Sequence, residues 1–445
     1  MSKTVRWMIV LGALLALCVS GASGQEPKAP ALDAAKKQAI INEISTLLNK
    51  NYIFADTAKK MEEALRARLK NGDFDKLETA PAFAQAVSNT LSMVSKDGHI
   101  GFAYNPAAAE DIRRLMGRSE EEANKVRERQ LLESRRDNFG FRKVERLGGN
   151  IGYVDFRMFA SPDQAGPTAI AAMNFLAYCD AIIIDLRQNG GGDPAQIQLI
   201  SSYFFDEPVH LNDLYARAAD RTENYWTLPY VPGPKAAGAD LYILTSARTF
   251  SGAEEFTYNM KNLKRATVIG ETTGGGAHPT GTRIVQHDFI LRVPYARAIN
   301  PVSKTNWEGT GVTPDVPVPA AQAFDRAYAM AVEKLAAKAS DPQRKGEFEW
   351  ILVGLRAQQD PPRVDEKALK IYAGEYGERK VTFENGALHY QRTGPKYRLV
   401  PLTEVLFTVE GLDYFRVEFV VKDGLAVELV GLYDNGDRQP SKRTK

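Results

Sequence analysis

The chain has 445 residues, of which 44% are hydrophobic, 25% charged and 9% aromatic. This composition is typical of a globular protein with a sizeable core, and the length favours two or three domains. The 57 Lys and Arg residues almost balance the 55 Asp and Glu residues. The chain therefore lacks the large basic field that recruits nucleic acid, and we expect no nucleic-acid partner.

The first 24 residues have the pattern of a secretory signal peptide. Lys3 and Arg6 precede an apolar run over residues 7–19, and Ala22-Ser23-Gly24 provides the small residues of a cleavage site. The run is shorter than the ~20 residues that a membrane-spanning helix needs. We therefore expect an exported protein, periplasmic or secreted, with no stable membrane insertion after cleavage; a retained membrane anchor is the alternative.

Cys179 is the one cysteine that remains after removal of this segment. A single cysteine cannot form an intrachain disulfide, so the fold must depend on its core even in an oxidising compartment. Cys179 lies in a mostly apolar stretch before a predicted strand at residues 181–184, which favours burial over a role as a catalytic thiol.

Residues 25–105 are predicted to form an N-terminal bundle of three helices. Asp33 and Asp56 stand where the N-caps of the first two helices belong. Each helix is expected to carry one apolar stripe, because apolar residues recur every three or four positions. These three stretches are 40–48, 61–69 and 83–94.

The middle of the chain predicts a charged arm followed by a layered domain. Residues 106–140 are so rich in Arg and Glu that little apolar face is left, so we expect a solvated helical arm. From 141 to 358 short β-rich runs alternate with helical patterns, which is typical of an α/β domain. We place the strands expected near Ile284 and Phe289 in this domain.

The last part of the chain predicts a small all-β module. Asp360-Pro361-Pro362 cannot continue a helix, so residues 359–364 are expected to form a linker. In residues 365–445, short β-rich runs are separated by Asn-Gly and Asp-Gly pairs, which favour tight hairpin turns.

Ser251 follows a buried-type strand and is predicted to stand at the start of a helix. A hydroxyl there lies beside free backbone N–H groups and the positive end of the helix dipole, where an oxyanion is stabilised. Glu254, three residues later, would equally make Ser251 part of a capping box. The spacing alone leaves both interpretations open.

The segment from Asp185 to Gly192 ends a hydrophobic strand in three glycines. Glycines at such a point let the backbone approach a ligand closely and aim N–H groups at negative charge. The segment lacks the Gly-Lys-Ser/Thr ending of a nucleotide-binding loop. A tight strand-to-helix turn is the structural alternative.

Two of the five histidines lie in contexts that favour chemistry. His99 follows Asp97-Gly98, and His278 follows three glycines at 274–276. Either could be a base or a satisfied polar side chain. Because there is no His-x-x-x-His spacing and no second cysteine in the mature chain, the sequence argues against a structural or catalytic zinc site.

Together these segments resemble the tail-specific (C-terminal processing) serine peptidase family. The resemblance is strongest to its branch that includes interphotoreceptor retinoid-binding protein and the tricorn protease core. It covers residues 33–340, whereas the C-terminal module resembles only a common β module appended to hydrolases. Six motifs carry it, in the family's order: Asp97-Gly98-His99, Gly152-Tyr153, Asp185 to Gly192, Thr249 to Glu254, Gly270-Glu-Thr-Thr-Gly-Gly and Glu308 to Asp315.

The resemblance implies an α/β core of the crotonase and Clp-protease kind, with Ser251 as the nucleophile. Some family members use as base a lysine about 25 residues after the serine, but Gly276 stands there in this chain. The tricorn-like alternative is a histidine from the segment before the α/β domain, which points to His99. Glu308 matches the carboxylate that orients this histidine.

The resemblance also implies an oxyanion hole formed by Gly191 or a neighbour and the N–H of Gly252. Gly98 stands where the tricorn pattern has a serine, so a Ser-His-Glu set is expected rather than a four-member relay. His278 is the alternative base. A PDZ module is not recognisable in the sequence, so recognition of free substrate C-termini is not implied.

We therefore expect an exported serine endopeptidase that cleaves peptide or unfolded-protein substrates through an acyl-enzyme, without a metal or organic cofactor. The alternative is a non-catalytic binding module of the same fold that holds an apolar or peptide ligand. The sequence indicates no particular oligomeric state.

Overall fold

The computed structural model describes residues 32–445, so the expected signal peptide lies outside the described residues. The chain divides into two compact units. The first contains the residues up to Val144, Val154–Tyr178 and Ile184–Ala320, and the second contains the rest. Within residues 32–445, no helix combines the length and apolarity that a membrane crossing requires. Cys179 is buried and unpaired, as expected.

The three N-terminal helices are α1 (Ala34–Asn51), α2 (Ala55–Lys70) and α3 (Ala80–Ser95). Asp33 caps α1 as predicted, because its carboxylate accepts the Lys36 N–H at 2.8 Å. The prediction for α2 was wrong: Phe54 occupies the N-cap position. Asp56 instead lies in the first turn, where a negative charge faces the positive end of the helix dipole.

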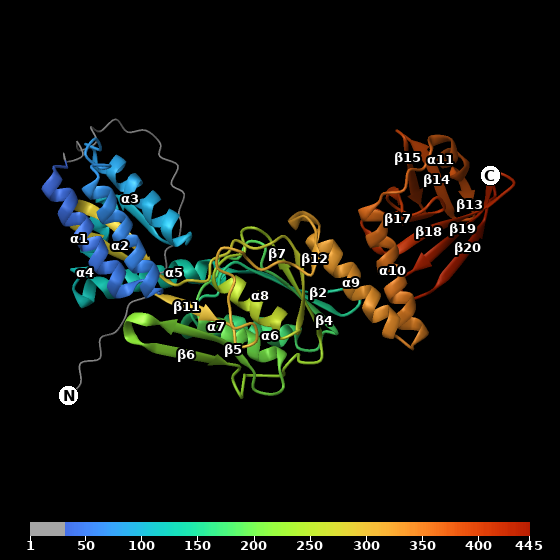
Figure 1. The fold of residues 1–445 in the computed structure, drawn as a ribbon. Coiled ribbons are helices and arrows are strands. Elements are labelled where there is room, and N and C mark those ends of the chain that lie inside the picture. Colours follow the sequence, from blue (N-terminus) through green and yellow to red (C-terminus); the bar gives the residue numbers. More distant parts are fainter. Residues whose placement is uncertain (1–31) are drawn as a thin grey trace. The chain divides into compact units, whose positions relative to one another are not determined.

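A β-hairpin completes the core of this helical region. Strands β9 (Thr280–Val285) and β10 (Phe289–Pro294) pair with β1 (Gly101–Tyr104) in the order β1-β10-β9. Their apolar side chains join those of the three helices in one buried cluster. Figure 1 shows these yellow strands among the blue helices. The strands near Ile284 and Phe289 therefore belong with the helices and not with the α/β layers, because their apolar face completes the helical core.

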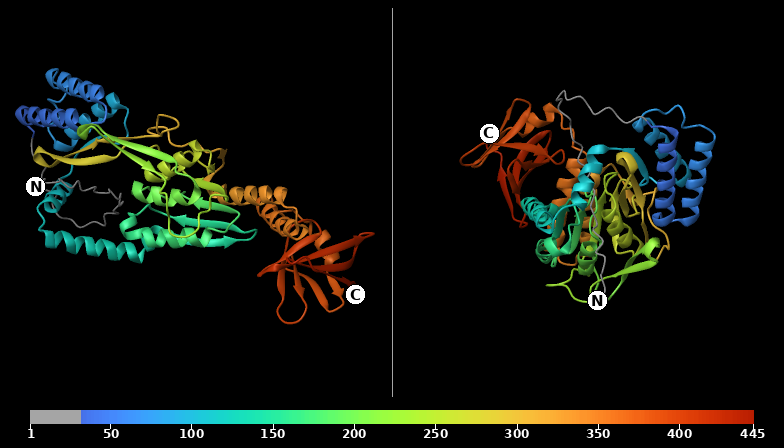
Figure 2. Two further views of the ribbon diagram at one scale, coloured as in Figure 1. Left: turned by 90° about the horizontal axis from the view of Figure 1, so that it is seen from below. Right: turned by 90° about the vertical axis from the view of Figure 1, so that its left-hand side faces the viewer.

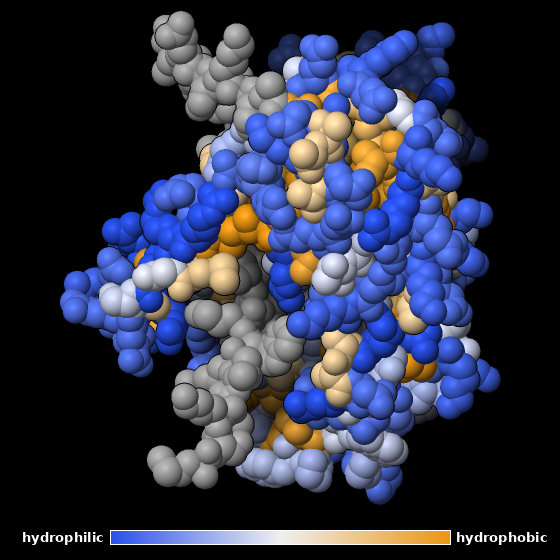
Figure 3. Space-filling model, turned by 60° about the vertical axis from the view of Figure 1, so that its left-hand side comes forward, coloured by the Kyte–Doolittle hydropathy of each residue, from blue (hydrophilic) through white to orange (hydrophobic). Residues whose placement is uncertain are grey.

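The charged segment forms two helices, α4 (Pro106–Met116) and α5 (Glu120–Arg136). Helix α5 has no buried residue, in agreement with its lack of an apolar stripe. Ser119 and Glu122 form a capping box at its start. The face of the molecule in Figure 3 is largely hydrophilic, with hydrophobic side chains in small separate groups.

The central sheet has six strands in the order β12-β8-β7-β4-β3-β2. Strands β7, β8 and β12 run parallel, and every residue of β4 is buried, as expected for a strand covered on both faces. Helices α6 (Pro162–Leu176), α7 (Pro194–Ser201) and α8 (Gly252–Asn262) pack side by side next to this sheet (Figure 2). The strands are β2 (Phe141–Leu147), β3 (Ile151–Phe156), β4 (Ala181–Asp185), β7 (Asp240–Thr245), β8 (Ala266–Gly270) and β12 (Val316–Pro317).

A second small sheet links the α/β layers to the helical region. Strands β5 (His210–Ala216), β6 (Arg221–Trp226) and β11 (Ala296–Ile299) are antiparallel in the order β11-β5-β6. Arg217, at the tip of the β5–β6 hairpin, donates hydrogen bonds of 2.6 Å to the carbonyl oxygens of Tyr52 and Asn49. These contacts fix the C-terminal end of α1 and its neighbour Tyr52.

The second unit contains α9 (Ala323–Lys338), α10 (Pro342–Gln359), α11 (Glu366–Tyr372) and an all-antiparallel sheet in which β13 to β20 follow chain order. Glu375 in β13 donates its N–H to the Lys445 carbonyl oxygen and accepts the Thr444 N–H, so the first strand meets the end of the chain. The strands are β13 (Gly374–Tyr376), β14 (Arg379–Glu384), β15 (Ala387–Gln391), β16 (Tyr397–Pro401), β17 (Leu406–Val409), β18 (Leu412–Lys422), β19 (Leu425–Tyr433) and β20 (Arg438–Lys442). The predicted fold class, an α/β core with N-terminal helices and a C-terminal β module, is confirmed.

Candidate active site

Ser251 lies in a strained turn between β7 and α8. Its backbone has φ of 53° and ψ of −121°, a conformation that residues with a side chain rarely adopt and that costs on the order of 1–3 kcal/mol. Its side chain is exposed, and α8 begins at the next residue. Such turns present a serine hydroxyl beside the N-terminus of a helix, as nucleophile elbows do in hydrolases.

Glu254 fixes this turn to the glycine-rich loop that follows β8. Its carboxylate accepts the N–H of Ser251 at 2.8 Å, which is the Glu254 half of the predicted capping box. The same carboxylate accepts the N–H groups of Gly275 and Gly276 at 2.7 and 2.8 Å and the hydroxyl of Thr273. Burial raises the pKa of Glu254 although these hydrogen bonds oppose the shift. The cap is therefore part of the site's scaffold.

Gly191 and Gly192 approach the Ser251 turn closely. A Cβ atom on Gly191, whose φ is 101°, would lie 2.5 Å from Gly252 N and 2.8 Å from Ser251 Cβ. The Gly191 N–H donates to Asn189 Oδ1 at 2.8 Å, so it already has a partner. The N–H groups of Gly192 and Gly252 have no protein acceptor within residues 32–445. A Cβ on Gly252 would lie 2.9 Å from Gly192 N, so the two free N–H groups lie close together.

His99 is held by the loop between α3 and β1. The preceding Asp97 accepts the His99 N–H at 2.9 Å in a local turn. The His99 Nδ1 atom lies 2.9 Å from Glu308 Oε1 and 3.4 Å from Asp97 Oδ1. Both carboxylates therefore face the same ring nitrogen. Among the described residues, Nε2 has no hydrogen-bond partner.

Glu308 comes from a segment that is bound along the glycine-rich loop. Its Oε2 atom accepts the Ala277 N–H at 2.7 Å. The neighbouring Trp307 donates its indole N–H to the Gly276 carbonyl oxygen at 2.9 Å, and the Gly309 N–H donates to the Gly275 carbonyl oxygen at 2.9 Å. These bonds on both sides of Glu308 fix its carboxylate beside His99.

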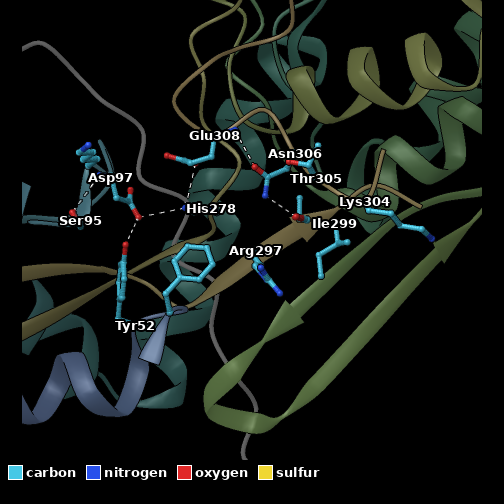
Figure 4. Close-up of a pocket in the computed structure, with 13 residues that line it drawn as sticks. Tyr52, Ser95, Asp97, His278, Arg297, Ile299, Lys304, Thr305, Asn306 and Glu308 are labelled. Carbon is cyan, nitrogen blue, oxygen red and sulfur yellow. Dashed lines mark hydrogen bonds and ion pairs between the residues drawn. The ribbon is translucent and has the colours of Figure 1, made fainter. Parts of the chain in front are cut away.

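His278 completes a four-member cluster with Asp97, His99 and Glu308. Its Nδ1 atom lies 3.4 Å from Asp97 Oδ2 and 3.4 Å from Glu308 Oε2 (Figure 4). Its side chain is only 4% exposed, and Nε2 is buried without a hydrogen-bond partner among the described residues. The ring packs edge-to-face against Phe54 and lines a pocket of about 270 Å³.

The cluster holds opposite charges close together. Burial alone would lower the pKa of His99, but its hydrogen bonds to Asp97 and Glu308 outweigh burial and raise the pKa to about 9. Burial alone would raise the pKa of Asp97, but hydrogen bonds from His278 and His99 outweigh it and hold the pKa well below its usual range. At neutral pH these shifts favour an imidazolium paired with carboxylates.

The structure places His99, rather than His278, beside the Ser251 turn. The His99 ring stacks on Phe250, the residue before Ser251, with ring centroids 5.7 Å apart. His278 instead faces Phe54, and its ring centroid lies 6.2 Å from that of His99. Within residues 32–445, no hydrogen bond joins the Ser251 hydroxyl to either imidazole.

Gly276 occupies the position where some family members have a lysine. A Cβ atom on Gly276 would lie 2.2 Å from Cζ of Phe250, so the aromatic ring fills the space that a side chain at this position needs. A lysine here therefore requires Phe250 to lie elsewhere.

Sequence reasoning named Ser251, His99, Glu308 and His278, and the structure brings their segments together. It did not name Asp97 as a site residue, although the position of Asp97 two residues before His99 was a usable signal. It also missed Tyr52, whose hydroxyl donates to Asp97 Oδ2 at 3.1 Å. No local pattern in the sequence marks Tyr52.

Comparison with known families agrees with this fold. The model of peptidase family S41 matches residues 150–318, and the model of the N-terminal domain of peptidase S41 in eukaryotic IRBP matches residues 32–132. Together the two matches cover more than half of the chain. The chain belongs to peptidase family S41, a family of serine peptidases.

A comparison with solved structures finds several similar chains at low sequence identity. The photosystem II D1 C-terminal processing protease is 14% identical, with 64% of this chain and 93% of that chain covered at a TM-score of 0.45. A putative peptidase from Parabacteroides merdae is 18% identical, with 68% of this chain and 98% of that chain covered at a TM-score of 0.48. Mature CPAF is 10% identical, with 68% of this chain and 99% of that chain covered at a TM-score of 0.47.

Proposed function

We propose that this protein is an exported serine endopeptidase that cleaves peptides or unfolded proteins through an acyl-enzyme. One observation carries the proposal: an exposed serine in a strained turn lies beside two free backbone N–H groups, and a carboxylate-bound imidazole stacks on the residue before it. Membership of a serine peptidase family supports peptide or protein substrates.

In the proposed mechanism, Ser251 Oγ attacks the substrate carbonyl carbon while His99 Nε2 takes the hydroxyl proton. The Nδ1–H of His99 donates to Glu308 Oε1, which keeps the lone pair on Nε2. The protonated His99 then gives its proton to the leaving amine. Water attacks the acyl-enzyme in the second half of the reaction, with His99 again as base.

The N–H groups of Gly192 and Gly252 are the proposed oxyanion hole. Both are free of protein acceptors within residues 32–445, and Gly252 opens α8, so the helix dipole adds to their effect. In this proposal Gly192 replaces Gly191, because the Gly191 N–H is donated to Asn189. Gly191 keeps a steric role, since a side chain there would collide with the backbone of Gly252.

His99 must come within about 3 Å of Ser251 Oγ for proton transfer. Its ring lies against Phe250, the residue next to the serine. We propose that substrate binding moves the ring along the Phe250 face into reach. Catalytic hydrogen bonds are often long without substrate and tighten in the complex.

A serine-directed phosphonate probe tests the proposal against the non-catalytic alternative. We expect covalent labelling confined to Ser251, loss of labelling in Ser251→Ala, and peptide products from an unfolded protein substrate, detected by mass spectrometry. Absence of both labelling and cleavage, with binding of an apolar or peptide ligand, would instead establish a binding module of this fold.

Export has a separate test. Mass spectrometry of the protein from fractionated cells should show a periplasmic or secreted chain that begins after Gly24. A chain that keeps residues 1–24 and sediments with membranes would support a retained anchor instead.

A further inference from the structure

The cluster of Asp97, His99, His278 and Glu308 has the spacing of metal ligands. One nitrogen or oxygen atom from each residue can be chosen so that all four lie within 4.8 Å of one another. The His99 Nδ1 atom lies 3.4 Å from Asp97 Oδ1 and 2.9 Å from Glu308 Oε1, and the His278 Nδ1 atom lies 3.4 Å from the other oxygen of each carboxylate. A good N–H···O bond is shorter than 3.4 Å. Ligands at about 2.1 Å from a tetrahedral zinc ion are about 3.4 Å apart.

We propose that these four side chains bind one zinc-type divalent cation and that the bound cation switches His99 off as a base. Imidazole nitrogens and carboxylate oxygens are both zinc ligands. The two carboxylates balance the two positive charges of the ion, so its burial leaves no net charge on the site.

The surroundings of the cluster support its ligand role. Ligating carboxylates in metal sites are themselves held by hydrogen bonds. Here Asp97 accepts the Tyr52 hydroxyl and the His99 N–H, and Glu308 accepts the Ala277 N–H. The pocket of about 270 Å³ is lined by Asp97, His278 and Glu308, so an ion can reach them (Figure 4).

The environment of His278 independently supports a bound metal ion. Its side chain is 96% buried, and its Nδ1 atom faces both carboxylates at 3.4 Å, while Nε2 has no partner among the described residues. The proposed peptidase mechanism does not use this residue. A metal bound to Nδ1 would account for burying a second imidazole in the cluster.

The sequence argued against a zinc site because it contains no His-x-x-x-His spacing and no second cysteine in the mature chain. The proposed ligands come from three remote segments: the loop that follows α3, the glycine-rich loop and the segment around Glu308. The hairpin β9–β10 and the hydrogen bonds between the two loops bring them together. No local motif can encode this arrangement.

Metal binding and catalysis compete for His99, and this part of the inference rests on the proposed function. When the cation binds Nδ1 of the His99 imidazolium, it takes the lone pair of that nitrogen and displaces the Nδ1 proton to solvent. The one proton left on a neutral imidazole then sits on Nε2. His99 Nε2 cannot accept the Ser251 proton in this form, so the metal-bound protein is inactive.

Zinc titration of the full chain tests the site without any need for activity. After EDTA treatment and its removal, isothermal titration with ZnCl₂ should show one site per chain, and CoCl₂ should give the visible absorption of four-coordinate cobalt. His278→Ala and Asp97→Asn should weaken zinc binding by about 10-fold or more, by analogy with losses of metal-site residues. MgCl₂ should give no saturable heat, because Mg²⁺ prefers oxygen ligands.

Two controls separate the site from folding and from surface binding. Ser251→Ala should bind zinc like the parent chain, because Ser251 is not a ligand. His210→Ala removes an imidazole that pairs with Asp213 outside the cluster, and it should also leave binding unchanged. Thermal unfolding and circular dichroism verify the fold of each variant, and His278→Gln serves if His278→Ala does not fold.

The outcomes distinguish the two proposals. Zinc that inhibits peptide cleavage over the range in which it binds, with recovery by EDTA, supports the switch. Binding that is absent, or that survives both Asp97→Asn and His278→Ala, overturns the metal site. Binding without inhibition overturns the switch alone. If no cleavage occurs at all, the proposed function fails while the titration still decides the metal site.

Discussion

The Ser251 turn and the imidazole–carboxylate cluster are built in opposite ways. The turn takes its shape from chain segments that end neighbouring strands, where Gly191 and Gly252 allow the backbone to approach Ser251. The cluster takes its shape from tertiary packing, which brings Asp97, His278 and Glu308 together around His99. The first is controlled by sterics and the second by charge.

Because of this contrast, different experiments address the two halves of the site. Changes at the turn should act through backbone strain and loss of donors, with little dependence on pH. Changes in the cluster should move the pKa of His99 and therefore the pH dependence of the reaction. Each half can thus be disturbed while the other is monitored.

Ser251→Ala should have the largest effect. We expect turnover to fall by about 10³-fold or more, because the nucleophile is lost. The free energy of unfolding should change little, since the side chain is exposed. Steady-state kinetics and thermal unfolding measure the two quantities. Full peptidase activity in this variant would remove Ser251 from the mechanism.

A parallel comparison of His99→Ala and His278→Ala should identify the base. We expect His99→Ala to lose turnover by about 10²–10⁴-fold, the usual contribution of a general base. His278→Ala should lose much less, because its ring lies against Phe54 and not against Phe250. The reverse order of effects would assign the base to His278.

Gly191→Ala should disturb the turn by sterics. The added Cβ would lie 2.5 Å from Gly252 N at a φ of 101°, so we expect a loss of about 1–3 kcal/mol in the free energy of unfolding and a drop in turnover of up to about 10²-fold. Gly190→Ala is the matched control, because nothing lies within 4 Å of the added atom. Equal effects from both variants would argue against the steric role.

The pH dependence should report the cluster. Because the carboxylates raise the pKa of His99 to about 9, kcat/KM should rise with pH and reach half of its plateau near pH 9. The stabilising effect of the imidazolium is fully present below the unfolded pKa near 6.5 and is lost as pH rises through about 9. Glu308→Gln should lower the pH at which kcat/KM reaches half of its plateau. If that pH does not change, a group other than His99 controls the pH dependence.

Tyr52→Phe should have the smallest effect. It removes one hydrogen bond to the Asp97 carboxylate, and we expect ~1–3 kcal/mol less stability and less than about 10-fold lower turnover. Chemical unfolding and kinetics measure these changes. A loss as large as that in His99→Ala would instead give Tyr52 a direct part in the reaction.

The features that the sequence predicted are those with local causes. The hairpin at Asn385-Gly386 was readable because both residues adopt positive φ, 53° and 78°, which this pair favours. Ser251 was readable because a strand, a serine and a helix follow one another. In contrast, the β9–β10 hairpin joins the helical region through long-range burial, which its own alternating pattern does not specify.

The details of hydrogen bonding were also beyond the sequence. Gly191 was a reasonable oxyanion donor until the structure showed its N–H donated to Asn189. Asp56 was a reasonable N-cap, but α2 begins at Ala55, two residues earlier than that choice requires. In both cases, more than one neighbouring residue could fill the role, and only the three-dimensional path of the backbone selects one.

The contact between Phe250 and Gly276 has a consequence for how this type of site can change. A lysine at 276 would meet the ring of Phe250 at once, and a smaller residue at 250 would remove the surface on which His99 rests. A change from a histidine base to a lysine base at such a site thus needs both substitutions together. Either substitution alone would disturb the packing around Phe250.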